Sequence, residues 1–525
     1  MLAVDAWKPA WERWTAFGAA RGAALEADGL AATRPVEFVV DDPTDAEAMF
    51  DVLTYQKGAA IVRMIEQHLG PALFRDGVRR YLAAHQYGNA ETADLWRALG
   101  VKAGQPIAAI MDGWVFRPGY PVITVTAEDG GRRLVFSQRR FSYLKGGQRD
   151  APWRIPVTYR LGLPGGVETR RLLFDSAEQR VTLPAPAEWV ALNEGGHGFY
   201  RVQYGPRLID VLTARSAELL GPAERFNLVN DGWAAALAGL SPVGDYLELT
   251  ARFRLETDRN VWSALLGSFA YLDRVVASGD RAGFEGLIRD RLDPAASRLG
   301  WSPRPGESDL VGSLRSDLLR ALGTLGNDPP TQAAAIELYT RGARLRSTVH
   351  PSLLPALVAV RAHTGAAADH AEMLRRSRTA PTPQEQSRYL FALAGFRDPE
   401  LVRRTLELID SGEVRAQDGP LLLQRLLLSP WARELTWDFV KQHWDGLTRQ
   451  YPLSGLIRLG EGVMGLATPE LEADVRRFFT ARAVSLGGKT LPRYLEQLRV
   501  AVAFREREGA ALTAYLARWA RGAPR

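Results

Sequence analysis

The stretch MDGWVFRPGYPVITVTAEDGGRRLVFSQ, residues 111–138, contains the point where the hydrophobic pattern changes its period. Before Pro121, apolar residues recur at steps of three and four, which is typical of a helix face. After it, apolar and polar residues alternate on both sides of DGG (129–131), and this pattern predicts a β-hairpin. A similar alternation around PGG (164–166) predicts a second hairpin. Several short strands with regular turns indicate a small β-sandwich.

The residues before this change are expected to be helical. Trp7, Trp11 and Trp14 recur at the spacing of one helix face, although Pro9 suggests that the helix begins near there. A second stripe follows at steps of three and four, and its members are Tyr55, Gly58, Val62, Ile65 and Leu69.

After the sandwich, segments of helical pattern follow one another to the end of the chain, separated by short Pro- and Gly-containing breaks. They show no strict repeat, so we expect an irregular superhelical array of antiparallel helix pairs, similar to a HEAT stack. The predicted fold class is therefore multidomain α+β. Its predicted domains are a helical region (1–118), a small β-sandwich (119–204) and a large all-α region (205–525).

Composition limits the possible functions. The net charge of +6 over 525 residues comes mostly from scattered arginines, which argues against a nucleic-acid partner. The absence of cysteine excludes disulfides, cysteine nucleophiles and thiolate metal sites, and it is consistent with a reducing compartment. No apolar run reaches the roughly 18 residues that a membrane span needs, and the N-terminus lacks the apolar core of a signal peptide. The expected location is the cytoplasm, without a membrane.

No complete catalytic or metal site is found in the sequence. A catalytic metal needs about three side-chain ligands, commonly including two histidines one helical turn apart. No two of the seven histidines are three to five residues apart, and His363 and His370, which are seven apart, have Gly365 between them. No G-x-S-x-G nucleophile motif occurs. GKT (488–490) lacks the first glycine of a phosphate loop, and LGEGVMG (459–465) has no preceding strand and is expected to be a helix break.

Several segments, read in order, do resemble one known family. They are FDVLTYQKGAAIVRM (50–64), HQYGNAETADLW (85–96), MDGWVFRPGYPVITV (111–125), QRRF (138–141), WRIPVTY (153–159), NEGGHGFYRVQY (193–204), VRAQD (414–418) and SPWARELTWDFVKQHW (429–444). The family is that of the aminopeptidase N-like zinc aminopeptidases, particularly the puromycin-sensitive and endoplasmic-reticulum aminopeptidase branch. The segments keep the family's order over nearly the whole chain.

The resemblance implies a four-domain enzyme that removes amino acids from the N-termini of peptides. In that family zinc is held by H-E-x-x-H and a further Glu, and a G-A-M-E-N loop grips the substrate amine. This sequence contains neither motif, so the resemblance implies zinc at the level of the family, with no metal ligand in this chain. The expected parts are the helical remnant of a thermolysin-like catalytic domain, the sandwich, and an ERAP-like C-terminal superhelix that caps the active site and binds peptide.

One catalytic residue carries over from the resemblance. Tyr55 occupies the position of the family tyrosine whose hydroxyl donates to the oxyanion of the tetrahedral intermediate, a role typically worth about 10²–10³ in rate. The alternative is that Tyr55 is an ordinary aromatic residue at the start of the buried stripe. Asp51, Lys57 and Gly58 are expected to fix the loop, with Gly58 allowing a neighbouring element to approach.

Other residues that stand out are expected to be structural. Trp153, Trp189 and Trp444 are predicted to lie in the core. Gly196 stands where relatives usually carry Gln or Met, which leaves the local packing open.

Three functions remain open. The chain is the C-terminal portion of an aminopeptidase and is inactive alone; or it is a non-catalytic helical scaffold that binds peptides or proteins; or it is one half of a split enzyme whose N-terminal half is a separate chain. The preferred peptide N-terminus and the oligomeric state are not determined by the sequence.

Overall fold

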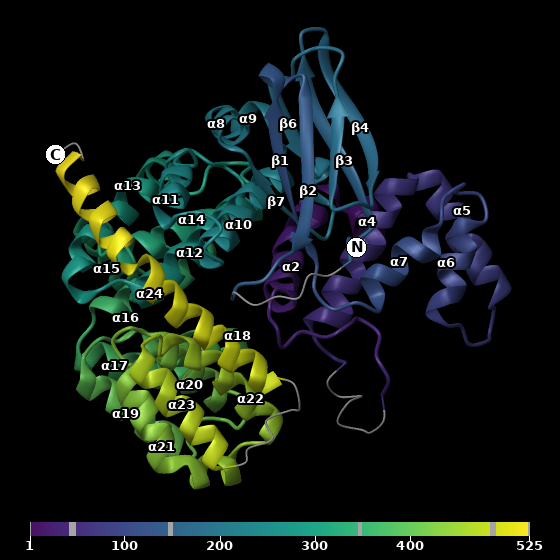
Figure 1. Ribbon diagram of the computed structural model, residues 1–525. Helices are drawn as coiled ribbons and strands as arrows, with labels where there is room; N and C mark the ends of the chain where they lie inside the picture. Colours follow the sequence, from purple (N-terminus) through teal and green to yellow (C-terminus); the bar gives the residue numbers. More distant parts are fainter. Residues whose placement is uncertain (1, 41–48, 145–150, 345–348, 483–489, 523–525) are drawn as a thin grey trace. The chain divides into compact units, whose positions relative to one another are not determined.

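The computed structural model describes residues 2–40, 49–144, 151–344, 349–482 and 490–522. The described chain is mostly helical, with a small sheet region and a large helical C-terminal region (Figure 1). It divides into two compact units, Met1–Ala238 and Gly239–Arg525. This division does not test the predicted domain boundaries at 118/119 and 204/205, which stay predictions.

Both predicted hairpins are confirmed. β1 (Pro121–Glu128) pairs antiparallel with β2 (Arg133–Arg140), and β3 (Ile155–Leu163) pairs antiparallel with β4 (Gly166–Phe174). The first turn has Asp129, Gly130 and Gly131 in succession at positive φ. Gly131 is required there, because a Cβ would lie 2.7 Å from the carbonyl oxygen of Ala187 at φ +100°.

The strands form two sheets. The first has the order β5-β2-β1-β7 and the second β4-β3-β6, where the new strands are β5 (Glu178–Thr182), β6 (Trp189–Leu192) and β7 (Arg201–Tyr204). The predicted alternation is clear in β3, where Ile155, Val157, Tyr159 and Leu161 are buried. Phe136 of the first sheet contacts Tyr159 and Phe174 of the second, with ring centroids 5.6 and 6.3 Å apart. The predicted sandwich is therefore present, closed by apolar side chains that each contribute about 1.5–3 kcal/mol on burial.

Helices come before and after the sheets in the first unit (Figure 1). Those before them are α1 (Leu2–Trp7), η1 (Pro9–Trp11), α2 (Arg13–Asp28), α4 (Gly58–Leu69), α5 (Pro71–Ala84), α6 (Thr92–Gly100) and α7 (Ile107–Val115), together with the short turn η2 (Leu53–Lys57). Those after them are α8 (Pro206–Ala214), α9 (Ser216–Leu219) and α10 (Pro222–Leu237). α4 contacts β3, and α8 contacts β6 and β1.

The prediction that the three N-terminal tryptophans share one helix face is wrong. The chain leaves helical geometry at Lys8 and again at Glu12, whose φ is +47°. Trp7, Trp11 and Trp14 therefore belong to three separate elements. Pro9 accounts for the first break, because proline opens a helix more readily than it continues one.

In its described residues the second unit contains helices, turns and loops and no strand. Its helices are α11 (Val243–Ala251), α12 (Arg259–Val275), α13 (Arg281–Leu299), α14 (Asp309–Thr324), α15 (Pro329–Arg344), α16 (Leu354–Thr364), α17 (Ala367–Thr379), α18 (Pro383–Ala392), α19 (Pro399–Asp410), α20 (Gly419–Leu428), α21 (Arg433–Gln450), α22 (Leu453–Gly462), α23 (Pro469–Ala481) and α24 (Thr490–Gly522), with short turns η5 (Ser278–Asp280), η6 (Pro351–Leu353), η7 (Leu393–Gly395) and η8 (Val463–Gly465).

These helices form successive pairs. α15 contacts α16 and α17 contacts α18, while α14, α16, α18 and α20 contact one another in turn. The long helix α24 runs along the unit in Figure 1 and contacts α11, α13, α22 and α23. The likeness to a HEAT stack stays a prediction.

The segment LGEGVMG is a helix break, as predicted. α22 ends at Gly462, and η8 ends at Gly465, where a Cβ would lie 1.9 Å from the carbonyl oxygen of Leu427. Gly465 is thus needed for close packing between α20 and η8. The other glycine-rich candidate, GKT (488–490), lies mostly outside the described residues.

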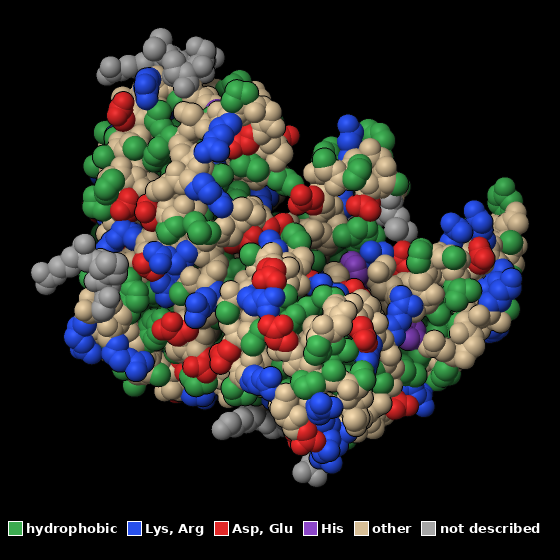
Figure 2. All heavy atoms as spheres, turned by 90° about the horizontal axis from the view of Figure 1, so that it is seen from above, with side chains coloured by type: hydrophobic (Ala, Val, Ile, Leu, Met, Phe, Trp, Pro, Cys, Tyr) green, Lys and Arg blue, Asp and Glu red, His purple; other side chains and the backbone are tan. Residues whose placement is uncertain are grey.

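Two further observations concern the helices and the surface charge. No helix in the described ranges combines the length and low polarity that a bilayer crossing requires. On the face drawn in Figure 2, Lys and Arg side chains are interspersed with Asp and Glu side chains.

Candidate functional site around Tyr55

The segment that carries Tyr55 is a single π-helical turn. In η2 the backbone N–H of Gly58 donates to the carbonyl oxygen of Leu53, five residues earlier, and also to that of Tyr55. Such wide turns are rare in proteins, and those that do occur are often found at functional sites. Leu53 and Lys57 are buried on the inner side of the turn, whereas Tyr55 points outward.

An ion pair fixes the beginning of this turn. The buried Arg34 lies 2.6 Å from the Asp51 carboxylate and also donates to Thr54 Oγ1 at 2.9 Å. The same Asp51 oxygen accepts the backbone N–H groups of Leu53 and Thr54 at 2.9 and 3.1 Å. Asp51 therefore satisfies two of the donors that a helix start leaves without intrahelical partners.

A second ion pair fixes the end of the turn. Lys57 Nζ lies 2.8 Å from Asp28 Oδ2, and both side chains are fully buried. Lys57 also donates to the carbonyl oxygen of Gly119 at 3.3 Å, and Asp28 Oδ1 accepts the backbone N–H of Gly119 at 2.9 Å. Burial is the largest influence on Lys57 and lowers its pKa, while Asp28 acts in the opposite direction. The pair joins α2, η2 and the start of the sandwich.

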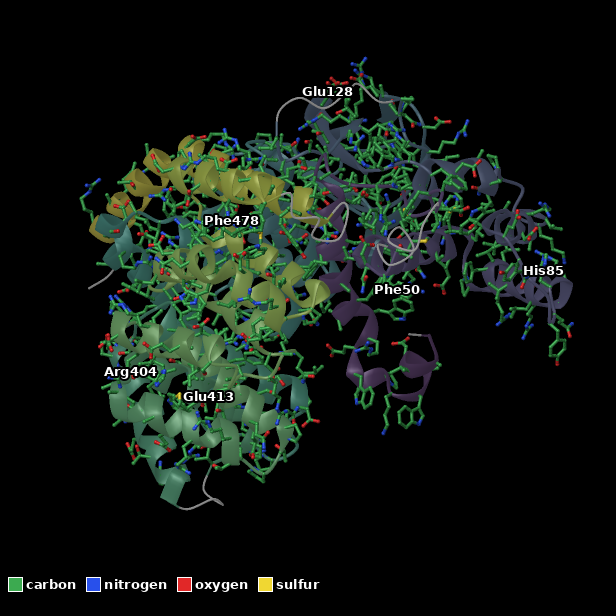
Figure 3. All side chains as sticks on the ribbon, turned by 90° about the horizontal axis from the view of Figure 1, so that it is seen from below. Phe50, His85, Glu128, Arg404, Glu413 and Phe478 are labelled. Atoms are coloured by element: carbon green, nitrogen blue, oxygen red, sulfur yellow. The ribbon has the colours of Figure 1, made fainter. Side chains whose placement is uncertain are left out.

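The Tyr55 side chain is 55% exposed, although Ile65 and Leu69 of the predicted stripe are buried. Tyr55 is therefore not buried with the rest of the stripe, and the alternative that it is an ordinary aromatic residue at the start of the helix stays an alternative. Its ring lies 6.3 Å from that of Phe50, which is 76% exposed and is labelled in Figure 3. The Tyr55 hydroxyl has no hydrogen-bond partner among the described residues, so the donor remains available.

Three residues were expected to fix the loop, and the structure confirms this expectation for two of them. Asp51 and Lys57 do so through the ion pairs with Arg34 and Asp28. The interpretation of Gly58 is wrong: in the described part of the chain, the nearest atom to an added Cβ is a Val36 methyl at 3.8 Å, which is ordinary contact. Arg34 and Asp28 were not foreseen, because no local pattern marks the partner of a buried charge.

The segment HQYGNAETADLW is not part of this site. His85 lies at the outer end of α5, well apart from Phe50 in Figure 3. Its Nδ1 faces the carbonyl oxygen of Asn89 at 3.3 Å, and Asp94 caps α6 by accepting the backbone N–H of Glu91 at 2.9 Å. This motif therefore shapes the connection between two helices.

The remaining predicted residues are structural, as expected. Trp153, Trp189 and Trp444 are buried. Gly196 has a φ of +74°, and a Cβ there would lie 3.0 Å from both Ala223 and Asn227. A larger residue at position 196 would need this contact to open.

The histidines do not form a metal centre in the described residues, where no three His, Cys, Asp or Glu side chains could hold an ion. His363 and His370 lie on different helices, α16 and α17, and His370 Nε2 faces Thr405 Oγ1 at 2.9 Å. His68 and His197, far apart in sequence, line one small hollow of about 20 Å³.

His197 is expected to make the first unit less stable in acid. Burial, followed by the positive charges of Arg63 and Arg21, lowers its pKa to about 3. The unfolded state, with a pKa of about 6.5, binds a proton between these values that the folded state does not bind. Stability should therefore fall as pH falls from about 6.5 to 3, by up to about 1.4 kcal/mol per pH unit from this group. Urea unfolding of wild type and His197→Gln at pH 6 and pH 4.5 measures how the free energy of unfolding depends on pH. An equal pH dependence in both would contradict the prediction.

The chain is similar to known proteins over nearly its whole length. The model of the peptidase family M1 domain matches residues 1–114, and the model of the ERAP1-like C-terminal domain matches residues 189–501. The chain is 30% identical over 521 residues to aminopeptidase M1-A of Oryza sativa subsp. japonica, covering 95% of this chain and 58% of the relative. It is 30% identical over 526 residues to aminopeptidase M1 of Arabidopsis thaliana, covering 95% and 59%. It is 30% identical over 476 residues to the leucyl aminopeptidase of Saccharolobus solfataricus, covering 90% and 57%. The chain thus spans less than three fifths of the length of these curated relatives.

Proposed function

Because this chain belongs to the aminopeptidase N-like family of peptidases, we propose that it is the C-terminal portion of a zinc metalloaminopeptidase that removes N-terminal amino acids from peptides. The observation that carries the proposal is the exposed Tyr55 on a π-helical turn held by two ion pairs.

Tyr55 is proposed to donate its hydroxyl hydrogen to the oxyanion that forms when the peptide carbonyl is attacked. A donor stabilises that charge best when its position is fixed beforehand, because no reorganisation is then needed during the reaction. Arg34–Asp51 and Lys57–Asp28 provide this fixation from the two ends of the turn. The exposed phenol is free to meet a substrate.

The described residues do not fit a zinc site, since they bring no three suitable side chains together. We therefore propose that the metal ligands belong to polypeptide other than this chain, and that the chain contributes only the hydroxyl donor and the residues that hold it. Exposed Trp7 and Trp11 in the same unit support a further segment packing there, because large exposed apolar side chains commonly mark interfaces. This segment could be supplied as a separate chain, which is the split-enzyme alternative.

The second unit is proposed to bind the distal part of the peptide and to cap the active site, and a hollow inside this unit supports the binding role. If catalysis is absent in every assembly, the same hollow supports the alternative function of a non-catalytic scaffold.

The purified 525-residue chain is expected to hydrolyse no aminoacyl anilide, with or without added zinc. Adding a polypeptide that spans the N-terminal two fifths of a relative such as aminopeptidase M1 should produce zinc-dependent turnover. Release of the anilide by the chain alone would contradict the proposal. Peptide binding without turnover in the mixture would favour the scaffold.

A further inference from the structure

The second sheet ends on a strand with an open side. β4 is the outermost strand in the order β4-β3-β6, and in Figure 1 it lies at the edge of its sheet. Among the described residues, β3 is the only element that contacts β4 extensively. Residues 166–169 are exposed on both faces of the sheet, and so is Arg171. An open strand edge offers unpaired backbone groups to another strand.

The register of the hairpin fixes which residues of β4 present those backbone groups. The β3–β4 turn has two residues, so the flanking pair Leu163 and Gly166 is a hydrogen-bonded pair of the ladder. Hydrogen-bonded and non-hydrogen-bonded pairs alternate along an antiparallel ladder. The even-numbered residues of β4 therefore bond to β3. Val167, Thr169 and Arg171 direct their N–H and C=O groups to the open side.

The hydrogen bonds on the other side of β3 agree with this assignment. The carbonyl oxygen of Gly162 accepts the backbone N–H of Glu188 at 2.9 Å, on the side of β6. Leu192 of β6 lies opposite Tyr159, but its N–H donates to the hydroxyl of Tyr204 at 2.9 Å. Even-numbered residues of β3 thus face β6 and odd-numbered residues face β4, as the turn requires.

The charges on β4 are arranged so that they complement a second β4. Glu168 and Arg170 point to the same face of the sheet and form an ion pair at 2.8 Å. Their side chains are 47% and 27% exposed, so both are accessible to another strand. A copy of β4 that pairs antiparallel about Thr169 places Glu168 opposite the partner's Arg170, and Arg170 opposite the partner's Glu168.

The neighbouring registers are less favourable. A shift of the copy by one residue removes the backbone hydrogen bonds, because groups that face β3 would then meet the copy. A shift by two residues places Glu168 opposite itself in one direction and Arg170 opposite itself in the other. Directly opposite side chains attract when their charges differ and repel when their charges are alike. Charges on edge strands usually prevent pairing, but here they select one self-complementary register.

We propose that β4 pairs with β4 of a second copy of this chain, antiparallel and centred on Thr169, so that the two second sheets become one continuous sheet. A two-fold axis relates the copies, because every contact is repeated in the opposite direction. The backbone groups of Val167, Thr169 and Arg171 hold the strands together, and the two Glu168–Arg170 pairs fix the register.

Sedimentation equilibrium of the full chain measures this association. The wild-type chain should form a concentration-dependent dimer. Glu168→Arg should weaken the dimer by about tenfold or more, because both opposite-charge pairs become like-charge pairs. The double variant Glu168→Arg with Arg170→Glu exchanges the two charges and should restore the dissociation constant to within about threefold of wild type.

The matched control is Glu178→Arg on β5, the outer strand of the first sheet. This strand is only five residues long, and it contains a similar ion pair between Glu178 and Arg180 at 3.0 Å. Glu178→Arg should leave the dissociation constant of the dimer unchanged, because β5 does not take part in the proposed contact.

A single introduced thiol tests the register, because the chain contains no cysteine. In the proposed pair the two Thr169 Cα atoms lie about 5.5 Å apart, within the roughly 4.4–6.8 Å that a disulfide spans. Thr169→Cys should therefore form a disulfide-linked dimer under mild oxidation. Thr182→Cys, at an exposed position at the end of β5, should not.

A chain that stays monomeric at every concentration tested would overturn the proposal. A dimer that Glu168→Arg leaves unchanged, a double variant as weak as Glu168→Arg, or Thr169→Cys cross-linking no faster than Thr182→Cys would also overturn it. Thermal unfolding of each variant separates a loss of association from a loss of fold. Because the association needs neither a metal nor Tyr55, its failure is separable from failure of the proposed catalytic function.

Discussion

Replacing Lys57 by methionine is expected to lower the free energy of unfolding of the first unit by about 3–5 kcal/mol. The substitution removes the ammonium group and leaves the Asp28 carboxylate without its 2.8 Å partner. Both side chains are fully buried, so water cannot replace the lost contact. An uncompensated buried charge costs much more than the net stabilisation that an intact buried pair provides. Urea or thermal unfolding followed by tryptophan fluorescence measures the loss.

Two further variants separate this effect from a simple change of volume. The double variant Lys57→Met with Asp28→Asn should recover part of the lost stability, because it removes both charges together and keeps an oxygen that can accept the backbone N–H of Gly119. Lys102→Met alters an exposed lysine of the same unit and should change stability by less than about 0.5 kcal/mol. A Lys57→Met protein as stable as wild type would show that the pair does not support the fold. A double variant no better than the single one would point to packing rather than charge.

In an active assembly that contains this chain, Tyr55→Phe is expected to lower kcat by about 10²–10³-fold. The change removes only the hydroxyl and keeps the ring near Phe50. Since the side chain is exposed and its hydroxyl has no partner in the described residues, the stability of the fold should hardly change. Binding of a substrate whose carbonyl is not yet attacked should change little, so the loss should appear in kcat more than in KM.

Tyr87→Phe is the matched control, because Tyr87 is another exposed tyrosine of the same unit and lies in the α5–α6 connection. Its turnover should equal that of wild type. If Tyr55→Phe also keeps the wild-type kcat, Tyr55 is a surface aromatic residue and not the oxyanion donor. If Tyr55→Phe loses activity together with stability, the effect belongs to the fold of the turn.

The two expectations concern one short segment. Lys57 and Tyr55 lie two residues apart in η2, yet one is fully buried and the other is exposed. The sequence pointed to both residues through the FDVLTYQKG segment, and it gave a role to each. It could not give the partner of Lys57, because Asp28 is 29 residues away and no periodic pattern links the two.

Local patterns determined the outline of the architecture. The alternation after Pro121 and the DGG and PGG turns were sufficient for both hairpins, because turn chemistry and side-chain alternation act between residues close in sequence. Trp153 and Trp189 were expected to lie in the core, and both are buried. The local patterns gave a wrong prediction where the backbone geometry changes within a few residues. At Glu12 this change separates Trp11 from Trp14, so the two do not share one helix.

Contacts between distant segments were decided only by tertiary structure. The packing of α2 and the segment after it against η2 brings Arg34 to Asp51 and Lys57 to Asp28. Likewise, His68 of α4 and His197 of the β6–β7 connection line one small hollow. The hollow inside the second unit exists because helices from separate parts of the sequence meet around it. The sequence alone specifies which residues can form helices, strands and turns, since those preferences are local. Which charges become buried together depends on how the whole chain packs.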